Sequence, residues 1–142
     1  MTIMVIDGQG GKMGKGLVEM LKKSCPEDEI LAIGTNSIAT AAMLKAGADA
    51  GATGENPAVV TSRTADIIVG PMGIVIADSL MGEITPAIAV AIGQSRAQKV
   101  LLPVNSHCGK IVVGVRELTL SRIMDEAVEV LRELCAPRST TL

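Results

Sequence analysis

Four short segments combine glycine with small polar residues, the types that let a chain bind a ligand through its backbone. Glycine lets backbone N–H groups approach a ligand closely, and the amino end of a following helix adds a partial positive charge that suits a phosphate. The segments therefore predict a site for a phosphate-bearing ligand. They are Asp7-Gly8-Gln9-Gly10-Gly11-Lys12-Met13-Gly14, Gly34-Thr35-Asn36-Ser37, Gly70-Pro71-Met72-Gly73 and Asn105-Ser106-His107-Cys108-Gly109.

The first segment is the most specific of the four. Its four glycines lie between the apolar run Ile3–Ile6 and a predicted helix, which is the context of a dinucleotide-binding loop. The spacing differs from the usual G-x-G-x-x-G pattern, because the last glycine comes one residue later, at Gly14. We expect the backbone amides of Gly10, Gly11 and Lys12 to hold the phosphate.

The second and third segments would complete such a site. We expect Thr35 and Asn36 to bind the sugar of the ligand and the stretch Gly70–Gly73 to line the far side. An NAD site usually has an acidic residue where the second strand ends, but this chain has Gly34-Thr35-Asn36 there. NAD, NADP, a mononucleotide and another phosphorylated metabolite therefore all stay open. An alternative is that Asn36 or Ser37 only caps a helix.

A reaction at this site would need a reactive side chain, and the candidates are Asp7, Glu55, Asn105, His107 and Cys108. His107 and Cys108 are adjacent, and neighbouring residues of an extended segment point to opposite faces, so they make a poor pair of nucleophile and base. A small buried cysteine and a surface histidine are the ordinary interpretation, and Asp7 can equally serve as a cap. Whether the protein is an enzyme stays open, and no metal site is expected.

The composition excludes several classes of function. The 142 residues contain no Phe, Tyr or Trp, so the chain lacks the aromatic platforms on which single-stranded nucleic acids stack, and it cannot use tyrosine in catalysis. A net charge of −2 gives no field that would attract nucleic acid or an acidic membrane, and one histidine cannot build a multi-histidine zinc site. No apolar stretch reaches the roughly 20 residues of a membrane span.

The first residues and the cysteines favour a cytoplasmic location. The stretch Met1–Asp7 has no basic lead and ends in an acid, so we do not expect a signal peptide. Cys25, Cys108 and Cys135 are odd in number and widely spaced, which fits reduced thiols better than a disulfide framework.

Strand and helix signals alternate along the chain. Predicted strands are Ile3–Ile6, Glu29–Ile33, Ala58–Val60, Asp66–Val69, Lys99–Val104 and Ile111–Val115, with a loop at Asp49–Pro57. Predicted helices are one that contains Met13–Leu21 and ends before Pro26, then Ser37–Ala46, Ile74–Leu80, Thr85–Gln94 and Thr119–Cys135.

The predicted strands are apolar almost throughout, which indicates burial on both faces, as in a parallel sheet between helical layers. We therefore predict one domain over residues 1–142, of the α/β class. It is a three-layer, Rossmann-like doubly wound domain with a mainly parallel sheet of five or six strands. In such a sheet ligands bind outside the carboxyl ends of the strands, where the four segments lie.

The glycine loop resembles that of the dihydrodipicolinate reductases. In that family Gly-x-Gly-Gly-Arg-Met-Gly follows the first strand, and here the stretch reads Gly8-Gln9-Gly10-Gly11-Lys12-Met13-Gly14. The resemblance implies a phosphate-binding turn but no reaction, because 142 residues leave no room for that family's catalytic second domain. The spacing Gly10-x-x-x-Gly14-x-Gly16 is also similar to that of short-chain dehydrogenases, whose Tyr-x-x-x-Lys pair cannot exist without tyrosine.

Most of the chain resembles an uncharacterised family of small proteins from mostly anaerobic bacteria, known only as a domain of unknown function. The stretches that carry the resemblance are Gly34-Thr35-Asn36, Ala39–Ala48, Gly51-Ala52-Thr53-Gly54-Glu55-Asn56 and Gly82-Glu83-Ile84-Thr85-Pro86. The resemblance implies a single Rossmann-like domain and no particular activity.

Two hypotheses for function follow. The first is a protein that binds a nucleotide or phosphorylated metabolite through the glycine-rich loop, with NAD or NADP among the candidate cofactors. The second is a structural or regulatory interaction module on a Rossmann-like scaffold with a vestigial loop. Its partner surfaces would be the apolar helices Ala39–Ala46 and Ala87–Ile92.

Self-association into a homodimer or a higher homo-oligomer is also expected. The stretch from Ile84 to Ser95 has no charged residue, and its helix is apolar nearly all round, with Ile88 and Ile92 on one stripe. A second copy related by a two-fold axis would cover this helix. An alternative is that the helix Thr119–Cys135 covers it within the chain.

Overall fold

The computed structural model describes residues 1–104, 110–115 and 118–137. Within these ranges the strands are β1 (Thr2–Asp7), β2 (Glu29–Gly34), β3 (Ala50–Thr53), β4 (Ile67–Pro71) and β5 (Gln98–Leu102). The α-helices are α1 (Lys12–Ser24), α2 (Ser37–Lys45), α3 (Glu55–Ser62), α4 (Pro86–Gln94) and α5 (Leu120–Cys135), and η1 (Met72–Val75) is a 3-10 helix.

The strands form one parallel sheet in the order β3-β2-β1-β4-β5. β1 lies at the centre, because it pairs with β2 on one side and β4 on the other, so that Ile3 is opposite both Ile30 and Ile67. The residues from Ile3 to Ile6 are fully buried, as their unbroken apolar run predicts.

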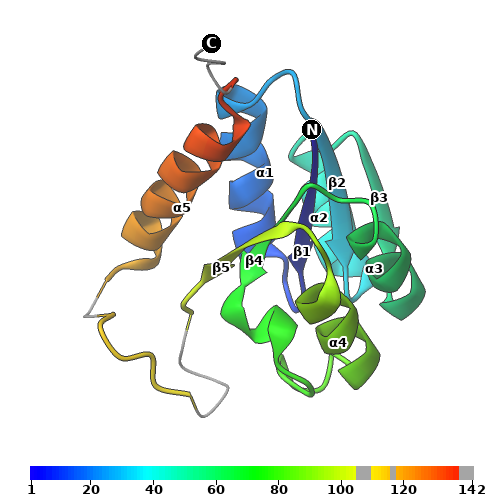
Figure 1. Ribbon diagram of the computed structural model, residues 1–142. Coiled ribbons are helices and arrows are strands. Elements are labelled where there is room, and N and C mark those ends of the chain that lie inside the picture. The colour runs from blue at the N-terminus through cyan, green and yellow to red at the C-terminus, as the bar shows by residue number, and fades with distance from the viewer. Residues whose placement is uncertain (105–109, 116–117, 138–142) are drawn as a thin grey trace.

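Helices cover both faces of this sheet (Figure 1). On one face α1, α2 and α5 share an apolar core that includes Leu17, Met43 and Leu131. On the other face α3, η1 and α4 form a second core that includes Ala58 and Ile88. The predicted three-layer, doubly wound α/β domain with a parallel sheet is confirmed.

The winding of the chain sets where a ligand would bind. From β1 the chain moves outward through β2 to β3, and α3 then returns it to β4 on the other side of β1. The direction of winding therefore reverses between β1 and β4. The carboxyl ends of these two strands mark the edge at which open α/β sheets bind ligands.

The region around β3 differs from its prediction. The sequence predicts a loop at Asp49–Pro57 and a strand at Ala58–Val60, but β3 lies within the first range and α3 covers the second. The small residues of β3 give almost no hydrophobic pattern from which a strand could be predicted. Backbone pairing with β2 holds this strand in place. Pro57 is tolerated in α3 because the first turn of a helix needs no intrahelical N–H bond.

Two further predicted elements are wrong. In place of a helix at Ile74–Leu80 the structure has η1 followed by turns, because the β-branched run that begins at Ile74 disfavours an α-helix. The strand predicted at Ile111–Val115 does not form, and β5 is the last strand at this edge of the described sheet. Ile111 and Val113 are each 93% exposed instead.

Three of the described α-helices start at a capping side chain, as their sequence signals predict. The side chains of Asn36, Thr85 and Thr119 each accept a hydrogen bond from a backbone N–H in the first turn of α2, α4 and α5. None of the described helices is both long enough and apolar enough to cross a membrane.

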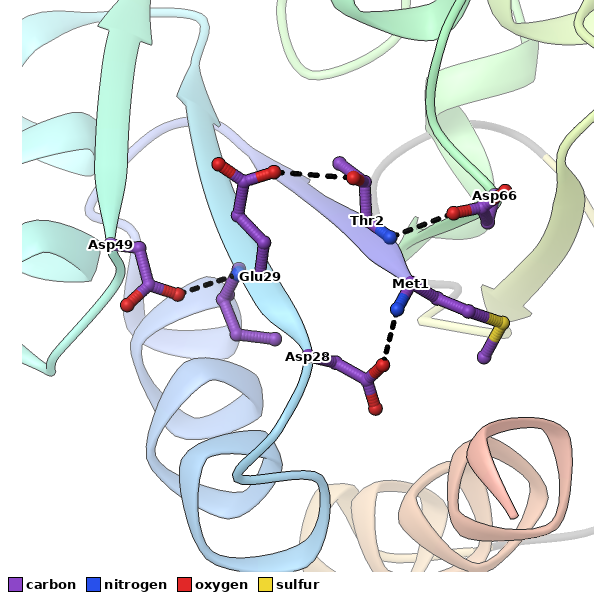
Figure 2. Close-up of polar contacts among 7 residues, drawn as sticks. Met1, Thr2, Asp28, Glu29, Asp49 and Asp66 are labelled. Carbon is purple, nitrogen blue, oxygen red and sulfur yellow. Dashed lines mark hydrogen bonds and ion pairs between the residues drawn. The ribbon is translucent and has the colours of Figure 1, made fainter. Parts of the chain in front are cut away.

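Carboxylates hold the amino ends of the strands (Figure 2). Asp66 Oδ2 accepts a hydrogen bond from Thr2 N at 2.7 Å, and Asp49 Oδ2 accepts one from Ile30 N at 2.8 Å. The hydrogen bond from Ile30 holds the pKa of Asp49 below its ordinary value. These acidic side chains lie at the end of the sheet opposite to the glycine-rich segments.

The apolar stripe of α4 packs on the sheet of its own chain. Ile88 and Ile92 are 1% and 0% exposed, whereas Val90 on the outer side is 54% exposed. α5 lies on the other face of the sheet, so the alternative in which it covers α4 is wrong. A dimer built on α4 stays a prediction, and it would have to use Val90 rather than the two isoleucines.

We expect Ile92→Ala to lower the free energy of unfolding by about 2–5 kcal/mol, because it empties a fully buried position in the core. Val90→Ala, on the outward side of the same helix, should change it by less than about 0.5 kcal/mol. Urea unfolding curves measure both values. Equal losses for the two variants would contradict the packing of α4 described above.

Candidate functional site

The Asp7 carboxylate holds the glycine loop at the carboxyl end of the central strand. Asp7 is buried, and its oxygens accept hydrogen bonds from Gly8 N at 2.8 Å and from Gly14 N at 2.7 Å. Burial raises the pKa of the Asp7 carboxyl above its ordinary value, while the same two hydrogen bonds lower it. Asp7 therefore ties the end of β1 to the first turn of α1, which is the capping role considered for it.

Three glycines of the loop are required by packing. A Cβ atom at Gly14 would lie 2.8 Å from the Cβ of Asp7, and one at Gly11 would lie 2.7 Å from the Cα of Ala39. Gly11 also has a φ of 72°, in the left-handed region that favours glycine. Gly8 is enclosed by side chains from two other segments. A larger residue at any of these positions would displace the loop.

Gly10 is not explained by packing. A Cβ atom there would meet no atom within 4 Å, and the residue is exposed. Its φ is not among the left-handed values of the chain. The fold therefore has no need of glycine at this position, and the space above Gly10 is open.

Backbone N–H groups beside Gly10 are free to bind an anion. The amides of Gly10, Lys12 and Met13 donate to no other residue in the described part of the chain, whereas Gly11 N donates to Gly8 O at 3.0 Å. The first turn of α1 contains no acidic residue. Free amides and the positive end of the helix dipole together favour a phosphate. Of the three predicted amides, that of Gly11 is already used within the loop.

Glu83, from the segment before α4, lies against this loop. Its Oε2 accepts a hydrogen bond from Gln9 N at 2.7 Å, and its Oε1 accepts one from Asn36 Nδ2 at 2.6 Å. Asn36 Nδ2 also donates to Gln9 O at 2.9 Å, and its Oδ1 accepts from Ala39 N at 2.9 Å. Asn36 thus caps α2 and joins the loop to Glu83, a residue that the predicted site did not include, because only the tertiary structure brings it to the loop.

The residues 78–83, which we name the covering segment, carry Glu83 to the loop. Three of its non-glycine residues have left-handed φ values: Asp78 at 65°, Leu80 at 55° and Met81 at 57°. Such values cost free energy, so this segment is strained. A Cβ atom at Gly8 would lie 3.1 Å from Leu80 Cδ1, which shows that Leu80 packs on the loop.

Thr35 carries a polar atom that the described structure leaves unsatisfied. Its Oγ1 is buried and has no hydrogen-bond partner there, while Thr35 N donates to Asp7 O at 3.0 Å. An unsatisfied buried hydroxyl costs about 1–3 kcal/mol, so it calls for a partner such as a bound ligand. Ser37, predicted beside it, is exposed at the start of α2.

The third predicted segment, Gly70–Gly73, reaches the same edge of the sheet at the end of β4. Gly70 allows β4 to approach the backbone oxygen of Ile6 closely, since an added Cβ atom would collide with it. Gly73 O accepts a hydrogen bond from Ser79 Oγ, which ties η1 to the covering segment. The contacts of this segment are structural, and its predicted role toward a ligand stays a prediction.

Two of the candidates for chemistry lie in described elements. Asp7 is engaged with the loop, and Glu55, at the start of α3, accepts a hydrogen bond on Oε1 from Thr85 Oγ1 at 2.7 Å. This bond ties α3 to the start of α4. Asn105, His107 and Cys108 lie outside the described residues.

Comparison with known proteins gives a family and a solved structure with some similarity. No curated protein matches the chain. A solved structure that resembles it is that of a dodecameric FMN-dependent UbiX-like decarboxylase from Escherichia coli O157:H7, with 14% identity and a TM-score of 0.45 over 100% of this chain and 98% of the other. A family model described as Domain of unknown function (DUF3842) matches residues 2–136, so the chain belongs to this family.

Proposed function

We propose that this protein binds a nucleotide or another phosphorylated metabolite, with the phosphate at the start of α1. The observation that carries the proposal is Gly10, which faces open space beside unused amides while its neighbours Gly8, Gly11 and Gly14 are confined by packing. Glycine lowers stability because it loses much conformational freedom on folding. A glycine that the fold does not need therefore supports the close approach of a ligand to the backbone.

The phosphate would bind through the backbone and one side chain. The N–H groups of Gly10, Lys12 and Met13 would donate to its oxygens, and the exposed Lys12 ammonium would add an opposite charge. The absence of an acid in the first turn of α1 leaves this positive end uncompensated by its own helix.

The sugar would lie toward the end of β2. The unsatisfied Thr35 hydroxyl is confined against Gly8, at the strand end where dinucleotide-binding sheets hold the ribose. A ribose hydroxyl or a second phosphate oxygen would satisfy it. Both NAD(P) and a mononucleotide fit this description, and the proposal covers binding and not a reaction.

The alternative of an interaction module rests on exposed apolar residues. Val60 on α3 and Val90 on the adjacent α4 are 48% and 54% exposed. The sequence suggested Ala39–Ala46 and Ala87–Ile92 as the partner surfaces, whereas the exposed valines put this surface on α3 and α4. A module of this kind would have no affinity for phosphorylated compounds.

The first test is a thermal-shift screen with NAD, NADP, FMN, ATP, GTP, coenzyme A, sugar phosphates and inorganic phosphate. A ligand at 100 times its Kd should stabilise the fold by about 2.7 kcal/mol, which is a shift of several degrees. Each nucleotide is paired with its nucleoside, such as riboflavin for FMN. Equal shifts for nucleotide and nucleoside would contradict binding through the phosphate, and no shift with any compound would favour the interaction module.

Gly10→Val should abolish binding of the compound found in that screen while leaving the Tm of the free protein nearly unchanged, because its side chain enters open space above the phosphate amides. Gly93→Val is the matched control, since Gly93 also has no atom within 4 Å of an added Cβ but lies on α4. The control should bind normally. Unaltered binding by a folded Gly10→Val variant would refute the proposed phosphate position.

Glu83→Gln should tighten binding of the same compound about tenfold. The substitution removes a negative charge beside the loop, and the amide oxygen of glutamine can accept only one of the two hydrogen bonds that the carboxylate accepts, which favours an incoming phosphate. Glu55→Gln, which weakens a contact between α3 and α4, is the control and should leave the Kd unchanged. Isothermal titration calorimetry measures both. Weaker binding by Glu83→Gln would mean that the carboxylate contacts the ligand instead of competing with it.

A further inference from the structure

Two cysteines that are far apart in the chain meet at the end of the molecule opposite to the glycine loop. Cys25 ends α1 and is 3% exposed, and Cys135 is the last residue of α5. These two helices pack side by side on the same face of the sheet (Figure 1). Both thiols are free.

A carboxylate group lies close to both sulfur atoms. The Sγ atoms of Cys25 and Cys135 and a carboxylate oxygen of Asp28 all lie within 4.8 Å of one another. Cys25-Pro26-Glu27-Asp28 forms a turn in which Asp28 N donates to Cys25 O at 3.1 Å. Cys25 and Asp28 thus have the two-residue separation of paired zinc ligands, and the third group comes from a distant helix, as is common in such sites.

We propose that Cys25, Asp28 and Cys135 form a site for a borderline-soft divalent cation, with Zn²⁺ as the cation that the donor set fits best. Two sulfur donors and one carboxylate oxygen select zinc over the hard cations Mg²⁺ and Ca²⁺. Tetrahedral coordination with Zn–S bonds of about 2.3 Å places two sulfur atoms roughly 3.8 Å apart, within the separation found here. On binding, each thiol releases its proton to solvent, and no electron is transferred.

The surroundings leave room for the ion and its fourth ligand. A cavity of about 210 Å³ adjoins the three donors, and its charged lining residues are Glu27, Asp28 and Arg132. Arg132 pairs with Glu129 at 2.9 Å, and no described Lys or Arg side chain pairs with Asp28. Asp28 Oδ1 forms a hydrogen-bonded ion pair with the Met1 ammonium at 2.6 Å (Figure 2), and its second oxygen stays available for the ion.

A bound cation would connect the ends of α1 and α5. Three protein ligands fill three of the four tetrahedral positions, so the fourth is open to water or a small ligand from the cavity. The site is separate from the glycine loop, because it lies beyond the other end of α1. Its presence therefore does not depend on the proposed nucleotide binding.

The test is a cobalt titration of the full chain in a Cys108→Ser background, which leaves only the two thiols of the site. The protein is reduced with a phosphine and stripped of metal, and Co²⁺ is added as the spectroscopic probe. We expect one equivalent to bind with a thiolate-to-cobalt charge-transfer band, and zinc to displace it. Zinc at saturation should raise the Tm by about 5 °C. Absence of the band in folded, reduced protein would overturn the proposal.

Single substitutions test whether cobalt binding depends on the three proposed donors and not on a neighbouring side chain. Cys135→Ser should abolish the charge-transfer band, and Asp28→Asn should weaken cobalt binding at least tenfold. Glu27→Gln is the matched control, since Glu27 lines the same cavity but is not among the three donors, and it should leave the affinity unchanged. Both Cys135 and Asp28 are partly exposed, so their variants are expected to fold even where Cys25→Ser does not. A band that survives Cys135→Ser, or an equal loss in Glu27→Gln, would refute the assignment.

Discussion

The structure of the candidate site depends on one buried carboxylate. Asp7 ends the central strand, and its two oxygens hold the first amide of the glycine loop and an amide in the first turn of α1. Burial raises the pKa of Asp7, so its contribution to folding is greatest below pH 3.8 and declines as the pH rises through the raised value. The two hydrogen bonds offset part of this cost, and they fix the loop relative to β1 and α1.

The placement of the other acids agrees with a site for an anion at one end of the sheet. Asp49 and Asp66 bind backbone amides at the amino ends of the strands, and Asp28 lies at that end too. At the carboxyl ends, the loop amides beyond the reach of Asp7 have no acid beside them in the first turn of α1. The negative charge that does reach them comes from Glu83, on a segment outside the sheet and its helices. The proposed anion site and the acid nearest to it thus belong to separate parts of the fold.

The fold could be predicted where a single local signal decides the structure. The buried run Ile3–Ile6 predicts a central strand, and capping residues such as Thr85 mark where helices begin. β3 could not be predicted, because Ala50–Thr53 depends on backbone pairing with a strand already in place. In the candidate site the glycine loop was evident, but the contact between Glu83 and Gln9 was not, because it joins residues whose proximity only the tertiary structure creates. The meeting of Cys25 and Cys135 was missed for the same reason.

The strain in the covering segment bears on how a ligand could enter. Glu83 accepts two hydrogen bonds, from Gln9 N and from Asn36 Nδ2, next to the amides of the proposed phosphate site, and these bonds would be lost if the segment moved away. Left-handed values at Asp78, Leu80 and Met81 cost of order 1 kcal/mol or more each, and residues that leave this conformation recover that free energy. If the covering segment moved away, the release of this strain would offset part of the free energy lost with the two hydrogen bonds of Glu83. Because Glu83 and the strained residues lie on one short segment outside the sheet, a movement of that segment away from the proposed site would require no change in the sheet or in α1.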